Sequence, residues 1–257
     1  MPTPLKDILA EADRLLESSR FQDYGPNGLQ VPGAEQVATL VTGVSAHVEL
    51  FERATDADAD LILVHHGLFW GSGAGPIDLA MKRRLKLLFD ADIALAAYHL
   101  PLDAHPQIGN NALLAKALGA ADLRPFAVHR NQPIGFLATL PGAGIPTRGA
   151  EGLFARVEEI MGQKPLVFDA GPETVRSIAI VTGAGTSHLP DAIAEGVDAF
   201  ITGEPAERAM ADAQEAGIHF IAAGHYATET FGIRALGEHL AEHFGLHHLF
   251  IDVRNPI

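Results

Sequence analysis

The sequence predicts an α/β protein, because short apolar runs alternate with amphipathic stretches along most of the chain. Apolar residues at helical spacing mark residues 5–20, 46–59 and 78–90, and short apolar runs suited to buried strands cover residues 37–44 and 61–67. Strands and helices that alternate in this way favour parallel pairing. We therefore expect a largely parallel sheet with helices packed on it.

The middle of the chain continues the alternation. A further strand is predicted to start at Ile93 and to run into a proline-broken loop that holds Asp103, and a helix then begins at Asn110. Residues 149–162 are predicted to form another helix, with short strands before and after it.

The order of elements in the first half then returns in the second half, which indicates an internal repeat. Val-Thr-Gly follows the opening strand of both halves, and His-x-x-x-acid ends the third strand, as His99 with Asp103 and as His225 with Glu229. Two unrelated βαβαβ units could also look alike, but the shared motifs favour duplication. We predict two similar α/β lobes related by this repeat, residues 1–124 with 226–257 and residues 125–225.

Composition limits the function classes. The 257 residues have a globular composition, no cysteine and a formal net charge of −14. An acidic surface repels a phosphate backbone, so nucleic acid is not an expected partner. The start of the chain does not resemble a signal peptide, and no apolar run approaches the ~20 residues that span a bilayer. We expect a cytoplasmic protein without membrane segments. Its 13 histidines invite a search for metal ligands.

Polar side chains gather where the predicted strands end. Ligands of open parallel sheets collect beyond the carboxyl ends of the strands. If the two lobes face each other, the groups of both halves converge on a metal site in the cleft between them. Histidine and carboxylate without thiolate suit zinc, iron, manganese, nickel or cobalt. The groups at the strand ends are His65, His66, His99, Asp103, His225 and Glu229.

Several long stretches of the chain resemble one known family. They are DYGPNGLQV, LILVHHGLFW, YHLPLDAHPQIGNNALLAKALG, DAFITGEPAERAMADAQEAGIHFIAAGHYATETFGIRAL and FIDVRNP. The chain is similar to the GTP cyclohydrolase 1 type 2 homologues, a family of interacting-factor-three-like proteins with a dinuclear metal centre. The resemblance covers nearly the whole chain. It implies that the metal ligands are His65, His66, Asp103, His225 and Glu229. It implies two divalent metal ions per chain and a homo-oligomer, a ring-shaped hexamer with its sites facing an inner cavity.

Three functions agree with these observations. The first is a metal-dependent hydrolase or GTP cyclohydrolase-like enzyme for a nucleotide or small phosphorylated substrate. The second is a metal-binding ring without catalysis, and the third is a scaffold for partner proteins. Convergent ligands favour the first two, and five protein ligands on two metals leave room for water, which favours catalysis. His99 is the candidate for acid–base catalysis, although it could also simply bond to nearby backbone.

Other polar and aromatic residues have both a functional and a structural interpretation. The basic run of residues 82–86 could capture phosphate but fits a solvated helix face better. Residues 24–28 are first of all a turn, and Trp70 could stack on a base or simply pack. His239 and His243 share a helix face, where a solvated pair is the simpler interpretation.

Overall fold

A computed structural model describes residues 2–71 and 76–257. The chain divides into two units. Unit 1 comprises Met1–Leu102 and Gly232–Val253, and unit 2 comprises Asp103–Phe231 and Arg254–Ile257. The chain passes between the units three times, inside helix α4 (Leu100–Ala104), near the start of helix α10 (Thr230–Phe244) and between Val253 and Arg254.

Unit 1 is built on a five-stranded sheet with the strand order β15-β4-β5-β6-β2. The first four strands in this order are parallel, and β2 pairs antiparallel with β6 at the edge. The strands are β2 (Gly28–Val31), β4 (Thr39–Ser45), β5 (Leu61–His66), β6 (Ala94–Ala97) and β15 (His247–Phe250). Near-continuous apolar sequence, such as LILV in β5, is typical of buried parallel strands.

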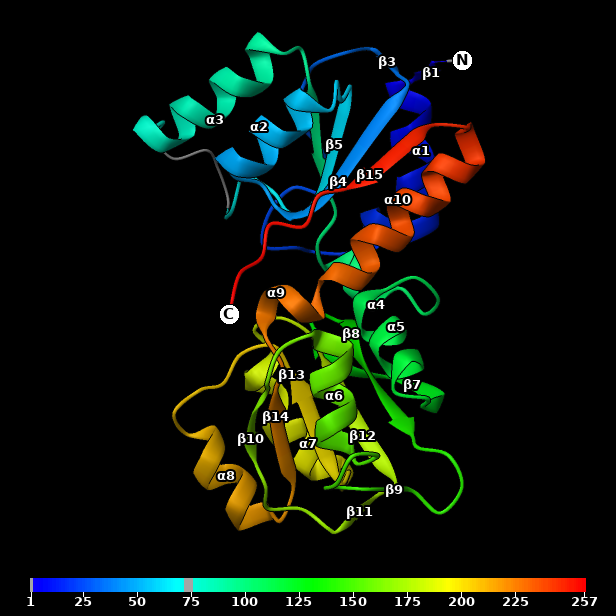
Figure 1. Cartoon of the computed structure of the whole chain (residues 1–257), viewed down its shortest axis with the longest axis vertical. Coiled ribbons are helices and arrows are strands. Elements are labelled where there is room, and N and C mark those ends of the chain that lie inside the picture. The colour runs from blue at the N-terminus through cyan, green and yellow to red at the C-terminus, as the bar shows by residue number, and fades with distance from the viewer. Residues whose placement is uncertain (1, 72–75) are drawn as a thin grey trace. The chain divides into compact units, whose positions relative to one another are not determined.

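Helices cover both faces of this sheet (Figure 1). Helices α2 (Val48–Asp56) and α3 (Leu79–Asp90) pack on one face, and α1 (Leu5–Leu16) and α10 lie on the other. Helix α1 buries every third or fourth residue along its length, as an amphipathic helix on a core does. Helix α3 begins where the Asp78 carboxylate accepts a hydrogen bond from the backbone N–H of Met81 at 2.7 Å.

Unit 2 is built on a six-stranded sheet with the order β10-β14-β13-β12-β8-β7. Only β12, β13 and β14 are parallel, and the other three strands pair antiparallel. The strands are β7 (Ala121–His129), β8 (Gln132–Thr139), β10 (Leu166–Phe168), β12 (Ser177–Val181), β13 (Ala199–Thr202) and β14 (His219–Ala222). The helices are α5 (Asn110–Ala117), α6 (Leu153–Met161), α7 (Leu189–Glu195), α8 (Ala209–Ala216) and α9 (His225–Thr228).

Helices α5 and α6 bury their apolar side chains against the unit 2 sheet. Leu114, Leu153 and Val157 are fully buried in one cluster with Ile180 and Ile201 from strands β12 and β13. Short elements complete the fold, namely β1 (Thr3–Pro4), β3 (Gln36–Val37), β9 (Ile145–Pro146), β11 (Thr174–Val175), and the 3₁₀ turns η1 (Ser18–Arg20) and η2 (Gly185–His188). No helix among the described residues is long and apolar enough to cross a membrane.

The two sheets anchor their parallel strands in the same way. In unit 1 the Asp60 carboxylate accepts hydrogen bonds from the backbone N–H groups of residues 38–39, at 2.7 and 2.9 Å. In unit 2 the Asp198 carboxylate accepts them from residues 176–177, at 2.7 and 3.0 Å. Asp60 directly precedes β5, and its hydrogen bonds hold the start of β4. Asp198 directly precedes β13, and its hydrogen bonds hold the start of β12. The local bonding of the two units is therefore alike at this point.

The expected α/β class is confirmed, and two details differ from the sequence analysis. The unit 1 sheet is largely parallel as expected, with only β2 antiparallel at its edge. The unit 2 sheet is instead mixed, because β7, β8 and β10 pair antiparallel with their neighbours. Asp103 lies in helix α4 rather than in a loop. Pro101 is tolerated there because it stands in the first turn, where its missing N–H would have no helical partner.

Candidate metal centre

Three histidines of unit 1 form one cluster. His65 and His66 end strand β5, and His99 follows strand β6 closely. Because β5 and β6 are neighbouring parallel strands, their carboxyl ends lie at the same edge of the sheet. Each histidine offers a ring nitrogen, and these nitrogens lie within 4.8 Å of one another. The sequence singled out all three residues, and we call them the imidazole group.

The rings of His65 and His66 are oriented through their Nδ1 atoms. His65 Nδ1 lies 3.0 Å from the carbonyl oxygen of Tyr98, and His66 Nδ1 lies 3.0 Å from Ser45 Oγ. A carbonyl oxygen only accepts, so Nδ1 of His65 carries the proton. The neutral ring then uses Nε2 as its basic nitrogen, which is the arrangement that outer partners impose on metal-binding histidines.

Asp23 orients the His99 ring, a contact that was not predicted from the sequence. Its side chain is only 2% exposed, and its Oδ1 accepts the Nδ1–H of His99 at 2.7 Å. Asn27 Nδ2 and the backbone N–H of Leu100 also donate to this carboxylate, at 3.0 and 2.8 Å. Burial raises the pKa of Asp23, but the hydrogen bond and positive charge of His99 outweigh it and lower that pKa. The sequence predicts a turn at residues 24–28, and the residue just before it fixes the His99 ring.

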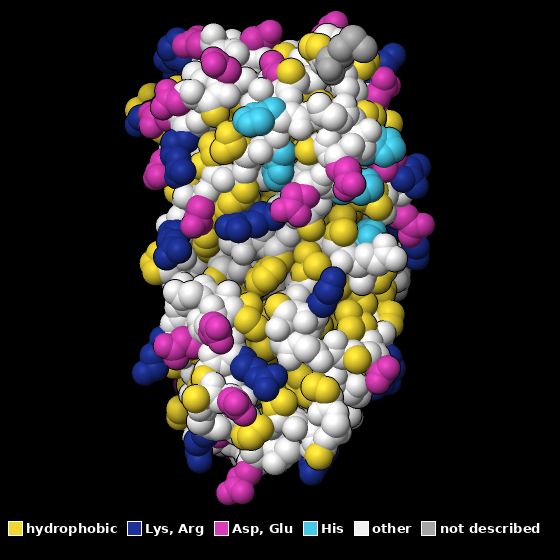
Figure 2. Space-filling model, turned by 45° about the vertical axis from the view of Figure 1, so that its right-hand side comes forward, with side chains coloured by type: hydrophobic (Ala, Val, Ile, Leu, Met, Phe, Trp, Pro, Cys, Tyr) yellow, Lys and Arg dark blue, Asp and Glu magenta, His cyan; other side chains and the backbone are white. Residues whose placement is uncertain are grey.

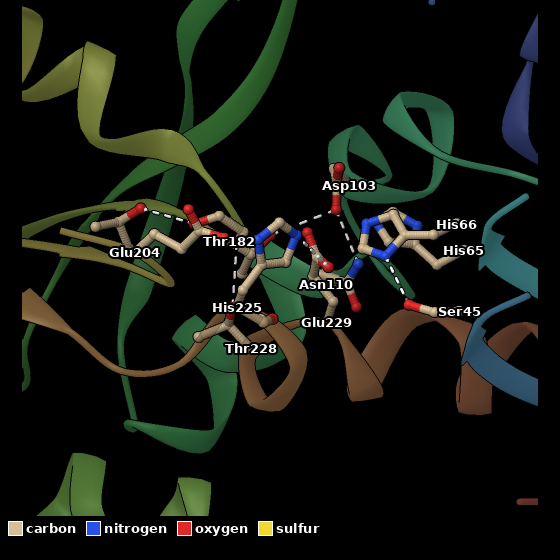
Figure 3. A network of polar contacts seen from close by, with 12 residues as sticks. Ser45, His65, His66, Asp103, Asn110, Thr182, Glu204, His225, Thr228 and Glu229 are labelled. Atoms are coloured by element: carbon tan, nitrogen blue, oxygen red, sulfur yellow. Dashed lines mark hydrogen bonds and ion pairs between the residues drawn. The ribbon is translucent and has the colours of Figure 1, made fainter. Parts of the chain in front are cut away.

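Unit 2 brings together the other three sequence-predicted residues. Asp103 and Glu229 are 6% and 2% exposed. A carboxylate oxygen of Asp103 lies within 4.8 Å of a carboxylate oxygen of Glu229. His225 starts helix α9 shortly after strand β14, and its Nε2 lies 3.1 Å from Glu229 Oε2. Figure 3 shows these side chains close together. We call Asp103, His225 and Glu229 the carboxylate group.

Donors from two other elements orient Asp103. Asn110 Nδ2 donates to Asp103 Oδ1 at 2.8 Å, and Thr182 Oγ1 donates to the same oxygen at 3.4 Å (Figure 3). Asn110 starts helix α5 and Thr182 follows strand β12, so the carboxylate is held by side chains from separate parts of unit 2. From the sequence, a Thr-Gly pair at a strand end indicates mainly a tight turn. The hydroxyl of Thr182 also donates to the Asp103 carboxylate.

His225 lies between two carboxylates. Its Nδ1 contacts Glu204, and its Nε2 contacts Glu229 (Figure 3). Burial lowers the pKa of His225, but the hydrogen bonds and charges of Glu229 and Glu204 outweigh it and raise that pKa to about 9. The surroundings therefore favour positive charge at this point. Glu204 was not predicted from the sequence, although its place shortly after the second strand of the repeat was a usable signal.

Gly183 lets a carboxylate approach the backbone. Its φ is +64°, and a Cβ atom there would lie 2.1 Å from Glu229 Oε1 and 3.2 Å from His225 Nε2. At the matching Val-Thr-Gly of unit 1, a Cβ on Gly43 would meet the flexible side chain of Leu50, at 2.8 Å. The glycine of the same Val-Thr-Gly tripeptide thus leaves room for the Glu229 carboxylate in unit 2 and for the core side chain of Leu50 in unit 1.

A second group of possible ligands lies outside these clusters. Glu11, His239 and His243, all in unit 1, place one ligand atom each within 4.8 Å of one another. Arg14, however, donates to both carboxylate oxygens of Glu11 at 2.7 and 2.8 Å, and this hydrogen bonding lowers the pKa of Glu11 to about 2. Because Glu11 already has a cationic partner, we do not assign a metal there.

The basic run on helix α3 is engaged by neighbouring acids. Arg83 bonds to Glu52 at 2.9 Å and Lys86 to Asp90 at 2.5 Å, and all four side chains are at least 49% exposed. On the face drawn in Figure 2, basic side chains are scattered among acidic ones. The exposed ion pairs of Arg83 and Lys86 favour the solvated helix face over phosphate capture.

Comparison with known proteins identifies the family. Residues 3–256 match the Duf34/NIF3 (NGG1p interacting factor 3) family. The chain belongs to this family. It is 48% identical to a Pseudomonas aeruginosa protein named GTP cyclohydrolase 1 type 2 homolog, over the full length of both chains.

Solved structures of similar proteins have the same fold. One described as protein ybgI, of unknown function, superposes with a TM-score of 0.91 at 43% identity, over 99% of this chain and 100% of the other. The protein TTHA1606 from Thermus thermophilus superposes with a TM-score of 0.87 at 37% identity, over 99% and 100%. The family resemblance seen in the sequence is thereby confirmed for essentially the whole chain.

Proposed function

We propose that this chain is a metal-dependent hydrolase with a dinuclear centre held by His65, His66, Asp103, His225 and Glu229. The observation that carries the proposal is that the rings of His65 and His66 are directed through Nδ1 in the manner of metal ligands. The carboxylate group adds two buried acids and one histidine with partners of their own. Two acids buried this close together repel each other, and a bound divalent cation would offset that repulsion.

Chain connectivity supports a shared site in a cleft between two lobes. His99 of unit 1 and Asp103 of unit 2 are four residues apart, and helix α4 runs between them. Glu229 lies three residues before Gly232, where the chain re-enters unit 1. Two of the three crossings between the units therefore lie beside members of the two groups, and the covalent chain there limits how far apart those members can be.

The donor set suits zinc, iron, manganese, nickel or cobalt, because it combines imidazole and carboxylate without thiolate. Bound metal ions would polarise a substrate oxygen and lower the pKa of a bound water toward neutrality. In this proposal Asp103 would help to hold the metal ions, and Asn110 and Thr182 keep its carboxylate in place. His99 accepts or donates the proton at Nε2, while Asp23 holds its Nδ1–H and fixes the ring.

The proposed substrate is a nucleotide or another small phosphorylated molecule, and GTP cyclohydrolase-like chemistry is one candidate reaction. The name of the Pseudomonas aeruginosa relative supports this class. The scattered charges of the face in Figure 2 give no support to nucleic acid as a partner. We also propose a homohexameric ring in the cytoplasm. Light scattering of the purified chain, coupled to size exclusion, tests the hexamer directly.

We further propose that the two lobes arose as an internal repeat. The matched hydrogen bonds to the carboxylates of Asp60 and Asp198 support it. The backbone carbonyl oxygen of each aspartate also accepts a hydrogen bond from the first residue of the third parallel strand, β6 or β14. The backbone N–H of Ala94 donates to Asp60 at 3.0 Å, and that of His219 donates to Asp198 at 3.0 Å. Unrelated βαβαβ units have no reason to share this whole set of contacts.

His99→Ala tests the catalytic role. We expect the metal-loaded variant to keep its metal and to hydrolyse nucleotides and small phosphoesters at least ~100-fold more slowly than the wild type, the usual contribution of a general acid or base. His105→Ala is the matched control, since His105 Nδ1 receives backbone N–H groups of Gln107 and Ile108. Unchanged turnover by His99→Ala at full metal occupancy would remove His99 from the mechanism. A wild type that loads metal but hydrolyses none of these compounds would favour a non-catalytic metal-binding ring.

A further inference from the structure

Two half-exposed aromatic side chains stand beside His99 in unit 1. Tyr24 is 47% exposed and Trp70 is 46% exposed. The Tyr24 ring lies edge-on to the His99 ring, with centroids 6.0 Å apart, and the Trp70 ring lies nearly perpendicular to it at 5.2 Å. Trp70 also lies 5.8 Å from the ring of His66. Core packing alone does not explain two large rings this exposed and this close to a polar cluster.

The two aromatic residues stand on loops that are tied together. The backbone N–H of Gly71 donates to the carbonyl oxygen of Tyr24 at 2.6 Å. Gly25 packs so closely on the second loop that a Cβ atom there would lie 2.4 Å from the carbonyl oxygen of Phe69. Phe69 in turn packs against the apolar core of unit 1. The rings are therefore presented on a fixed support, which reduces the entropy lost when they hold a ligand.

The polar side chains near these rings are already used by the protein. Asn27 Oδ1 accepts from the backbone N–H of His99 at 2.9 Å, and its Nδ2 donates to Asp23. Gln30 accepts from the backbone N–H of Leu68 at 2.7 Å and donates to a backbone carbonyl oxygen at 2.9 Å. Two amides that could read the edge of a bound ring are thus committed to holding the loops. The surface around Tyr24 and Trp70 can therefore contact a ligand mainly through its two aromatic rings.

We propose that Tyr24 and Trp70 form a stacking subsite for a planar heteroaromatic ring, such as a nucleobase, next to His99. The inference rests on the proposed function in one respect, because the ring is taken to be part of the substrate. Stacking accepts any planar ring, so the subsite discriminates weakly between purines and pyrimidines beyond their stacking area. Recognition of the rest of the substrate is left to the metal centre.

Trp70 is the only tryptophan of the chain, which makes it a specific reporter. We would titrate the full-length protein with guanosine monophosphate, cytidine monophosphate and ribose 5-phosphate, and follow tryptophan fluorescence with and without added metal. We expect saturable quenching by both nucleotides and none by ribose 5-phosphate. Equal quenching by ribose 5-phosphate, or none by either nucleotide, would overturn the subsite.

Substitutions at Tyr24 separate stacking from folding. Tyr24→Ala should weaken nucleotide binding by about 5- to 150-fold, the range that ~1–3 kcal/mol of stacking gives. Tyr24→Phe should bind like the wild type, because it keeps the ring. Phe89→Ala is the matched control, since Phe89 is 57% exposed and lies on helix α3. Circular dichroism of each variant checks that it is folded.

The readouts distinguish failure of this inference from failure of the proposed function. Full metal loading with unchanged nucleotide affinity in Tyr24→Ala would refute the stacking subsite and leave the metal centre intact. Ring-dependent quenching in a chain that takes up no metal would refute the metal centre and support the subsite. A fluorescence change that depends on protein concentration and not on nucleotide would assign the two rings to a contact between copies of the chain, which also overturns the proposal.

Discussion

The two units share local bonding in their sheets and differ in the chemistry placed at the strand ends. Asp60 and Asp198 secure the start of a parallel strand by the same kind of backbone hydrogen bonds. At the strand ends, unit 1 carries a group made only of imidazoles, whereas two of the three residues in the group of unit 2 are carboxylates. The sheet fixes where side chains project, and the residues around them decide what they can bind. Positions that match in the sheet but differ in their surroundings test this comparison best.

The largest difference is expected at the two Val-Thr-Gly glycines. Gly183→Ala places a Cβ against Glu229 and His225 and puts a side chain on a left-handed residue. We expect it to lower metal affinity by about 10- to 100-fold without removing any proposed ligand, as loss of an outer partner does. Gly43→Ala meets Leu50, so it should cost about 1–3 kcal/mol of stability by overpacking and leave metal affinity unchanged.

Metal titration and urea unfolding of both glycine variants check this prediction. Gly162→Ala controls for backbone strain alone, because its φ is +63° and a Cβ there meets no atom within 4 Å. If Gly43→Ala also lost metal affinity, or if Gly183→Ala kept it, the different roles assigned to the two glycines would be wrong.

A smaller effect of the same order is expected at the two matched aspartates, and Asp198 additionally accepts a hydrogen bond from Ser177 Oγ at 3.1 Å. Asp60→Ala and Asp198→Ala each leave two backbone N–H groups without their charged acceptor, which should cost about 1–3 kcal/mol of folding free energy. Urea unfolding of each variant measures the cost. Asp90→Ala is the control, because its exposed ion pair with Lys86 is worth at most ~1 kcal/mol. A neutral result for one aspartate and a large one for the other would count against the internal repeat.

The smallest effect concerns pH and belongs to unit 1. Burial lowers the pKa of His248, whose Nε2 lies 2.8 Å from Thr42 Oγ1. The unfolded chain binds a proton at this residue near its ordinary pKa of about 6.5, and the folded chain does so only at lower pH. The stability that neutral His248 contributes is therefore present above pH ~6.5 and is lost as the pH falls through the folded pKa.

We would measure the urea midpoint of metal-free wild type and His248→Gln at pH ~7.5 and ~5.5, on either side of the ordinary histidine pKa. The glutamine cannot titrate, so we expect the variant to lose less stability between the two pH values than the wild type does. His243→Gln, at an exposed position, should behave like the wild type. Equal losses in the wild type and His248→Gln would show that His248 contributes nothing to the pH dependence.

The sequence located the candidate ligands better than it located their partners. His65, His66 and His225 stand where buried strands end, and the strand-end rule finds such residues without a structure. Asp23 could not be found in this way, because its partner His99 is 76 residues away and the stretch after Asp23 has the composition of a turn.

Identical sequence motifs also concealed different surroundings. The two Val-Thr-Gly copies look alike, but the role of each glycine depends on a residue far along the chain or on a neighbouring helix, Glu229 for Gly183 and Leu50 for Gly43. The edge strand β15 was missed because its two histidines interrupt the apolar pattern of HHLF. Short-range patterns predicted the elements, whereas these contacts arise only when the chain is folded.

The most direct test of the metal centre is the metal content of the untagged chain, purified without chelator. We expect about two transition-metal ions per chain in the wild type and in His239→Ala, and a sharp loss in Asp103→Ala. His239 is the matched control because it belongs to the Glu11 cluster, outside the proposed ligands. A wild type that stays empty even in metal-supplemented buffer, or an Asp103→Ala chain that holds as much metal as the wild type, would contradict the account.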